Sequence, residues 1–243
     1  EYVGIKGGMV ILVADDPGPI SSQTEQDTRH FSRFSKLPCF DPSSAQEAYE
    51  MIQEAFEYSE KYGTPVFLRP TTRVCHGYAS IMVKDETEYT HHQPEGFIKD
   101  SKRWVIFPRL SFMNHKKIEA RNQELSDIFS SYEKNTIHPS CDAFKDSKKG
   151  IATGGISYTY TMETLKKTGM VKTLKIATPH PFPEKLAVDF LSGLDEVLCL
   201  EELDPVIERE LIYICGKYHL PTRISGKLSG HTACAGENTR DTI

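Results

Sequence analysis

The chain has 243 residues, of which 38% are hydrophobic and 26% are charged, and its formal net charge at pH 7 is −5. This is the composition of a soluble globular protein with room for two ordinary domains. No basic stripe is interleaved with aromatic residues, which argues against a nucleic-acid partner.

The longest apolar run, Met9–Ala14, has six residues. About 20 would be needed to cross a bilayer, so we expect no membrane span. The amino end has neither the basic nor the apolar region of a signal peptide. The six cysteines are far apart and form no CxxC pair, so neither a zinc ribbon nor a ferredoxin-type cluster is predicted. Free thiols favour a reducing, cytoplasmic setting.

The first third of the chain alternates strands and helices, which predicts a parallel sheet. The expected elements, in chain order, are a fully buried strand at Gly8–Ala14, a polar helix at Thr24–Ser35, a short strand at Leu37–Phe40, a helix over residues 44–62 and a strand at Val66–Leu68. Ser44 and Glu47 match a capping box in which each side chain satisfies a backbone N–H near the other. Gly63 and Pro65 are expected to end that helix.

The stretch from Cys75 to about Lys149 reads as a connector. Its histidine pair at residues 91–92 suggests a surface loop, Trp104–Phe107 a short extended segment, and Met113–Glu133 a charged helix with a few apolar contacts.

From Gly150 onward the alternation resumes and predicts a second, smaller α/β unit. Asp204 is the expected N-cap of a helix in which Pro205 is the first helical residue. After Thr222 the chain becomes rich in Gly and Thr and is expected to form a linker.

Most of the candidate functional side chains lie in the segment after the first strand. Asp15-Asp16-Pro17-Gly18 is either a functional loop at the carboxyl edge of the sheet or a turn that needs Asx capping and a glycine with positive φ. A polar cluster follows this segment. It is either part of the functional loop or the solvated start of a helix, where acidic groups are favourable. Its members are Gln23, Glu25, Gln26, Asp27 and Arg29.

Other motifs are weaker. His91-His92 and His138–Cys141 have no second ligand at helical spacing, so no metal site is predicted. Cys75-His76 has no third group to orient a nucleophile. Gly154-Gly155 lacks the third glycine and the acidic residue of a dinucleotide fingerprint, so a tight turn is favoured. The loops Thr178–Pro183 and Glu201–Asp204 are either partner contacts or rigid corners.

Several stretches together resemble the α subunits of indolepyruvate:ferredoxin oxidoreductases, which are thiamine-diphosphate enzymes. The segments that carry the resemblance, in order, are Lys6–Arg29, Pro42–Arg73, Gly150–Tyr160, Glu196–Ile212 and Gly226–His231. The resemblance implies two parallel-sheet α/β domains. Residues 1–75 would be the latter half of a pyrimidine-binding domain, 76–149 a connector, 150–226 a transketolase C-terminal-like domain, and 227–243 a linker to a missing domain.

For the intact enzyme, the resemblance implies oxidative decarboxylation of aryl 2-oxo acids to aryl-acetyl-coenzyme A, with electrons passed to ferredoxin. It implies thiamine diphosphate, Mg²⁺ and [4Fe–4S] clusters as cofactors. The implied partners are the flanking domains, a β subunit, ferredoxin and coenzyme A, in an oligomer.

The resemblance also implies that the glutamate that protonates the cofactor lies upstream of this chain, which would therefore hold no catalytic residue and bind no cofactor alone. The implied cofactor-binding residues are Asp16, Gly18, Gln23, Glu25, Gln26 and Arg29. Two alternatives stay open. The intact enzyme could act on another 2-oxo acid such as pyruvate, or the chain could be a non-catalytic assembly module.

Overall fold

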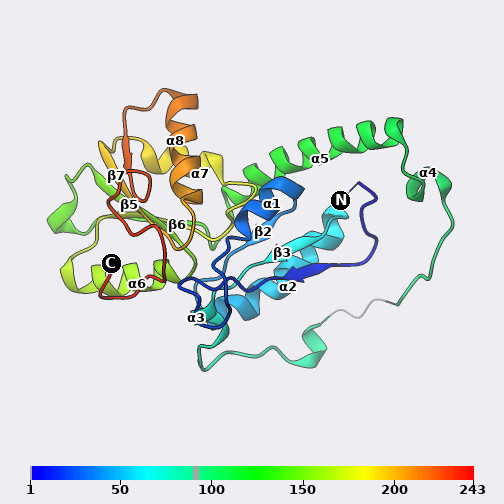
Figure 1. Cartoon of the computed structure of the whole chain (residues 1–243), viewed down its shortest axis with the longest axis horizontal. Coiled ribbons are helices and arrows are strands. Elements are labelled where there is room, and N and C mark those ends of the chain that lie inside the picture. The colour runs from blue at the N-terminus through cyan, green and yellow to red at the C-terminus, as the bar shows by residue number, and fades with distance from the viewer. Residues whose placement is uncertain (1, 90–92) are drawn as a thin grey trace.

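The computed structural model describes residues 2–89 and 93–243. It contains two α/β units, with the long helix α5 crossing from the far end of the connector to the second unit (Figure 1). The histidine pair at residues 91–92 lies outside the described residues. No helix in the described part of the chain is long and apolar enough to span a membrane.

The first unit is a parallel three-stranded sheet with the order β1-β3-β2. Its elements are β1 (Val10–Leu12), α1 (Arg29–Ser35), β2 (Cys39–Phe40), α2 (Ala45–Tyr62), β3 (Val66–Leu68) and α3 (Thr72–Cys75). The predicted strand at β3 is confirmed, and its central place in the sheet explains why all three of its residues are buried.

The prediction of a fully buried strand at Gly8–Ala14 was wrong. Only Val10–Leu12 is a strand, and because β1 pairs with β3 alone it lies at the edge of the sheet. Leu12 is 65% exposed as a result. A continuous apolar run predicts a strand but does not say whether both of its sides are covered.

The helix predicted at Thr24–Ser35 begins only at Arg29. The Asp15 carboxylate accepts hydrogen bonds from the backbone N–H of Thr28 (2.9 Å) and from its hydroxyl (2.5 Å). These contacts hold the chain before Arg29 against the end of β1, so the segment from Thr24 to Thr28 does not join the helix.

Helix α2 has half of the predicted capping box. The Ser44 hydroxyl accepts from the backbone N–H of Glu47, as expected. The Glu47 carboxylate instead binds the backbone N–H and hydroxyl of Ser43, and it pairs with Lys175 of the second unit. Gly63, with a φ of +58°, ends the helix as predicted.

The connector holds a 3₁₀ turn η1 (Glu86–Glu88), α4 (Ser101–Trp104) and α5 (Pro108–Phe129). Trp104 is therefore helical, and the extended segment predicted at Trp104–Phe107 is reduced to Val105–Phe107. Helix α5 begins earlier than predicted because Pro108 suits the first helical position, and it ends at Phe129. Its buried apolar contacts include Leu125 and Phe129, which pack with α2 in the core of the first unit.

The second unit is a five-stranded sheet with the order β4-β6-β5-β7-β8, parallel except for β4. Its elements are β4 (Thr136–His138), a 3₁₀ turn η2 (Asp142–Phe144), β5 (Lys149–Gly154), α6 (Gly155–Thr168), β6 (Lys172–Ile176), α7 (Glu184–Leu191), β7 (Glu196–Leu200), α8 (Val206–Tyr218) and β8 (Arg223–Ser225). This sheet already begins at β4, within the stretch predicted to be a connector.

Two further expectations for the second unit were wrong. Helix α8 begins at Val206 and is capped by the Glu201 carboxylate, which accepts from three backbone N–H groups of its first turn, rather than by Asp204. The chain does not loosen after Thr222 either, since β8 pairs in parallel with β7.

Candidate functional site

The carboxyl ends of the parallel strands in the two sheets face each other. Backbone bonds join them there: the Cys39 N–H donates to the carbonyl of His180 (2.7 Å), and the Asp41 N–H to the carbonyl of Ala177 (2.8 Å). A Cβ on Gly155 would lie 3.1 Å from an Asp41 oxygen, so the units are in close contact. The carboxyl edge is where ligands usually bind in α/β folds.

Charged side chains fill this junction, which we call the seam. Five of them lie within three residues after the end of a strand, the other two lie at the start of α1, and all are buried. The seam consists of Asp15, Asp27, Arg29, Asp41, Arg69, Glu201 and Glu202.

Two guanidinium groups organise the seam. Arg69 donates to Asp15 (2.6 Å) and to Asp41 (3.2 Å) within the first unit. Arg29 donates to Asp27 (2.6 Å) and, across the units, to Glu201 (2.8 Å).

The Arg29 guanidinium also donates to the backbone carbonyls of Glu202 and Asp204. Because Nε, Nη1 and Nη2 of Arg29 all have partners, this side chain holds the units together.

The seam contains more carboxylates than guanidinium groups. Burial raises the pKa of Asp41 and of Glu201, and the nearby arginines oppose the rise. Burial also raises the pKa of Glu202 to about 7. For Asp27, burial is the largest single effect and acts in the same direction, but the charges of Arg29 and Arg69 and the hydrogen bonds from Arg29 together outweigh it and lower the pKa. Glu202 is therefore the seam carboxyl that gains or loses its proton near neutral pH.

The loop predicted to bind the cofactor lies beside the seam, and several of its polar groups hold its own shape. Buried Asp16 accepts from the backbone N–H groups of Ser21 (2.6 Å) and Ser22 (2.5 Å) and from the Thr72 hydroxyl (2.5 Å). The Thr72 hydrogen bond lowers the pKa of Asp16. Gly18, whose φ is +74°, donates its N–H to Glu25 (2.9 Å).

Gln23 and Gln26 differ from these residues because both are exposed. The Gln26 amide makes one long contact, 3.5 Å, with the Thr24 hydroxyl. The six predicted residues thus divide into four that build or anchor the loop and two whose side chains face solvent.

The C-terminal segment crosses back over this loop. The Gly236 N–H donates to Glu25 (2.8 Å), and the Asn238 N–H donates to Glu202 (2.9 Å). Glu237 forms a two-point ion pair with Arg73, at 2.5 Å for each contact. Residues after β8 therefore cover the seam and the loop together.

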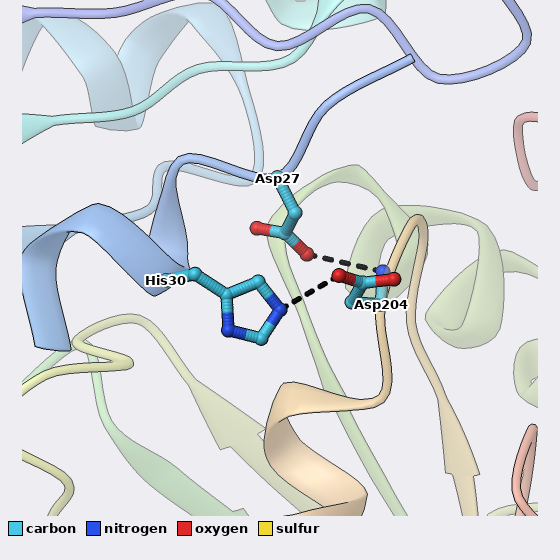
Figure 2. A group of neighbouring side chains, drawn as sticks. All are labelled: Asp27, His30 and Asp204. Carbon is cyan, nitrogen blue, oxygen red and sulfur yellow. Dashed lines mark hydrogen bonds and ion pairs between the residues drawn. The ribbon is translucent and has the colours of Figure 1, made fainter. Parts of the chain in front are cut away.

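One group of three side chains has its potential metal-ligand atoms within 4.8 Å of one another. Its members are Asp27, His30 and Asp204 (Figure 2). His30 Nε2 lies 2.7 Å from an Asp204 oxygen, and the Asp204 N–H donates to Asp27 (3.1 Å). Since Asp27 already binds Arg29, we interpret the group as a structural contact that joins α1 to the loop before α8.

Two weaker motifs have structural explanations. His138 Nε2 lies 3.0 Å from the Tyr158 hydroxyl and 3.1 Å from the Thr136 hydroxyl. Gly155 has a φ of +52°, so the tight turn favoured for Gly154-Gly155 is present.

Sequence reasoning missed Asp15, Asp41, Arg69 and Glu201 as members of one cluster. A signal was present, because Asp41, Arg69 and Glu201 each directly follow the last residue of an apolar strand. What the sequence lacks is any sign that the two sheets would face each other.

No protein-family model matches the chain. It is similar to the indolepyruvate oxidoreductase subunit IorA of Methanothermobacter thermautotrophicus, with 39% identity over 94% of this chain and 36% of that subunit. It is also 39% identical to the IorA subunit of Pyrococcus abyssi over 87% of this chain and 33% of that subunit. The chain thus spans about a third of the length of these relatives.

Among solved structures, the chain resembles a 2-oxoglutarate:ferredoxin oxidoreductase from Magnetococcus marinus, with a TM-score of 0.58 and 14% identity over 90% of this chain and 45% of that one. It also resembles a split-gene transketolase, described as an inactive β4 tetramer, with a TM-score of 0.52 and 15% identity over 89% and 55% of the two chains. At these identities the likeness concerns the fold alone.

Proposed function

Because this chain is homologous to about a third of the IorA subunit of indolepyruvate oxidoreductases, we propose that it forms part of such an enzyme. The proposed reaction is the oxidative decarboxylation of aryl 2-oxo acids to aryl-acetyl-coenzyme A, with ferredoxin as electron acceptor. The observation that carries the proposal is 39% identity over 94% of the chain. The proposed partners are the remainder of the subunit, a β subunit, ferredoxin and coenzyme A.

We propose the domain division implied by the family resemblance, with two adjustments. Residues 1–75 correspond to part of a pyrimidine-binding domain, and the transketolase C-terminal-like domain includes β4, because that strand pairs with β6. The end of the chain, from residue 227, acts as a cover for the seam as well as a linker. The contacts of Gly236 and Asn238 support this role.

The proposed cofactors of the intact enzyme are thiamine diphosphate, Mg²⁺ and [4Fe–4S] clusters. When bound, thiamine diphosphate would supply the nucleophilic and electron-accepting chemistry that decarboxylation of a 2-oxo acid needs. The loop residues fit one wall of such a site. Gln23 and Gln26 present exposed amides, and an amide both donates and accepts hydrogen bonds, as an aminopyrimidine requires.

The remaining four residues support that wall. Asp16, Gly18 and Glu25 fix the loop backbone through the hydrogen bonds described above. Arg29 is a positioning residue, since its donors bind Asp27 and Glu201 and hold the loop against the second unit.

Calorimetric titration of thiamine diphosphate with Mg²⁺ tests this proposal. We expect no binding heat with the isolated chain and saturable binding with the intact subunit. In the intact enzyme, Gln23→Ala should weaken cofactor binding more than Gln53→Ala, a matched change on the outer part of α2. Tight binding by the isolated chain, or equal effects of the two substitutions, would contradict the proposed half-site.

A further inference from the structure

A small cavity adjoins the seam at Arg29. It has a volume of about 230 Å³ and is bounded by α1, the loop after β6 and the first turns of α8. The polar side chains around it are Arg29, His30, Arg33, His180, Arg209 and Glu210. At about 30 Å³ for each water molecule in the liquid, the space equals that of several waters.

The charged residues that line the cavity are three arginines and one glutamate, so the formal charge of the lining is positive. Arg33 pairs with Glu210 (2.5 Å), the one carboxylate among the lining residues. Arg29 is neutralised by Asp27 and Glu201. Arg209 is exposed and has no hydrogen bond or ion pair from its guanidinium to another described residue. One cation is therefore left uncompensated at the rim.

His180 contributes an unsatisfied donor or acceptor. Its Nε2 is buried and has no hydrogen-bond partner among the described residues. Leaving such a group unpaired is unfavourable, because burial has removed its water partner. Burial, together with the charges of Arg33, Lys36 and Arg121, lowers the pKa of His180 to about 4, so the ring is neutral at pH 7. A neutral imidazole can still donate one N–H to an anion.

We propose that this cavity binds the phosphate group of a small ligand, with Arg209 and Arg33 as charged partners and His180 as a hydrogen-bond donor. Phosphate matches the guanidinium fork, and its oxygens accept from several donors at once. Neither Gln23 nor Gln26 lines the cavity, so the site is distinct from the exposed amides of the cofactor loop.

Calorimetric titration of inorganic phosphate into this chain at pH 7, in chloride buffer, tests the proposal. We expect saturable binding to one site. Arg209→Gln should weaken it about tenfold, the loss expected for one charge-assisted contact. Arg109→Gln, at an exposed arginine of α5, is the matched control and should leave binding unchanged.

Two further measurements make the test independent of folding defects. Glu210→Gln should tighten phosphate binding, because it removes the carboxylate at the cavity and releases Arg33. The imidazole NMR signals of His180 should shift on titration with the same midpoint. No saturable binding, or equal affinities for the Arg209→Gln and Arg109→Gln variants, would overturn the proposal.

A parallel titration with glycerol 3-phosphate distinguishes two sources of the group. Tighter binding than inorganic phosphate, with the same dependence on Arg209, indicates a phosphate ester as the ligand. Equal or weaker binding indicates free phosphate.

Discussion

Replacing Glu202 with Gln is expected to make the folded state less sensitive to pH. Glu202 is 5% exposed, and its carboxylate accepts one hydrogen bond, from the Asn238 N–H. Burial raises its pKa from 4.5 to about 7, and the nearby charges of Asp41 and Glu237 contribute to the rise. The folded chain therefore binds this proton more tightly than the unfolded chain does.

The direction in which stability changes with pH follows from proton linkage. Below pH 4.5 the carboxyl is protonated in both states. As the pH rises through the window from 4.5 to about 7, the unfolded state loses its proton first, so stability falls and then levels off. The window spans about 2.5 pH units, and at about 1.4 kcal/mol for each the loss is about 3 kcal/mol.

Urea unfolding at pH 4.5 and pH 8 measures this effect. Glu202→Gln stays neutral and keeps an oxygen for the Asn238 N–H, so it should match the parent at pH 4.5 and be more stable by about 3 kcal/mol at pH 8. Asp195→Asn, whose side chain is 71% exposed in the parent, is the control and should change stability by less than about 0.5 kcal/mol. A Glu202→Gln variant no more stable than the parent at pH 8 would refute the reasoning.

Three other substitutions probe the seam and the loop. Arg29→Met removes the partner of buried Glu201 and should destabilise the chain by about 3–5 kcal/mol in urea unfolding; a loss below 1 kcal/mol would show that the ion pair is not what joins the units. Gly155→Ala places a methyl group 3.1 Å from Asp41 at a φ of +52°, and should lower stability by about 1–3 kcal/mol, so an unchanged urea midpoint would speak against the close contact. Gln23→Ala in the intact enzyme should lower kcat/KM about tenfold without moving the unfolding midpoint, and wild-type kinetics would remove this residue from the site.

Structure set by neighbours along the chain could be predicted from the sequence. The Ser44 cap, the Gly63 stop of α2 and the apolar strand β3 depend on contacts within a few residues. The alternation of strands and helices also gave the parallel α/β class, which the two observed sheets and their structural relatives confirm.

Features that depend on distant contacts could not be predicted. The start of α1 is fixed by Asp15 bonding to Thr28, and the cap of α8 is supplied by Glu201 rather than by Asp204 next to it. The edge position of β1 depends on which strands pair, and a single apolar run does not encode that.

The candidate site shows the same division. The polar loop was visible in the sequence because it follows an apolar run. The role of Arg29 was not, because its partner Glu201 lies 172 residues away. These acidic and basic residues are far apart in the sequence. They form one buried network because the carboxyl edges of the two sheets face each other.

The proposed function is tested most directly by the ferredoxin-reduction rate of the intact subunit, assembled with the proposed β subunit and supplied with thiamine diphosphate, Mg²⁺ and coenzyme A. Indolepyruvate, pyruvate and 2-oxoglutarate are compared as substrates. We expect kcat/KM to be highest for indolepyruvate. A preference for either of the other two acids, or no ferredoxin reduction with any of them, would contradict it.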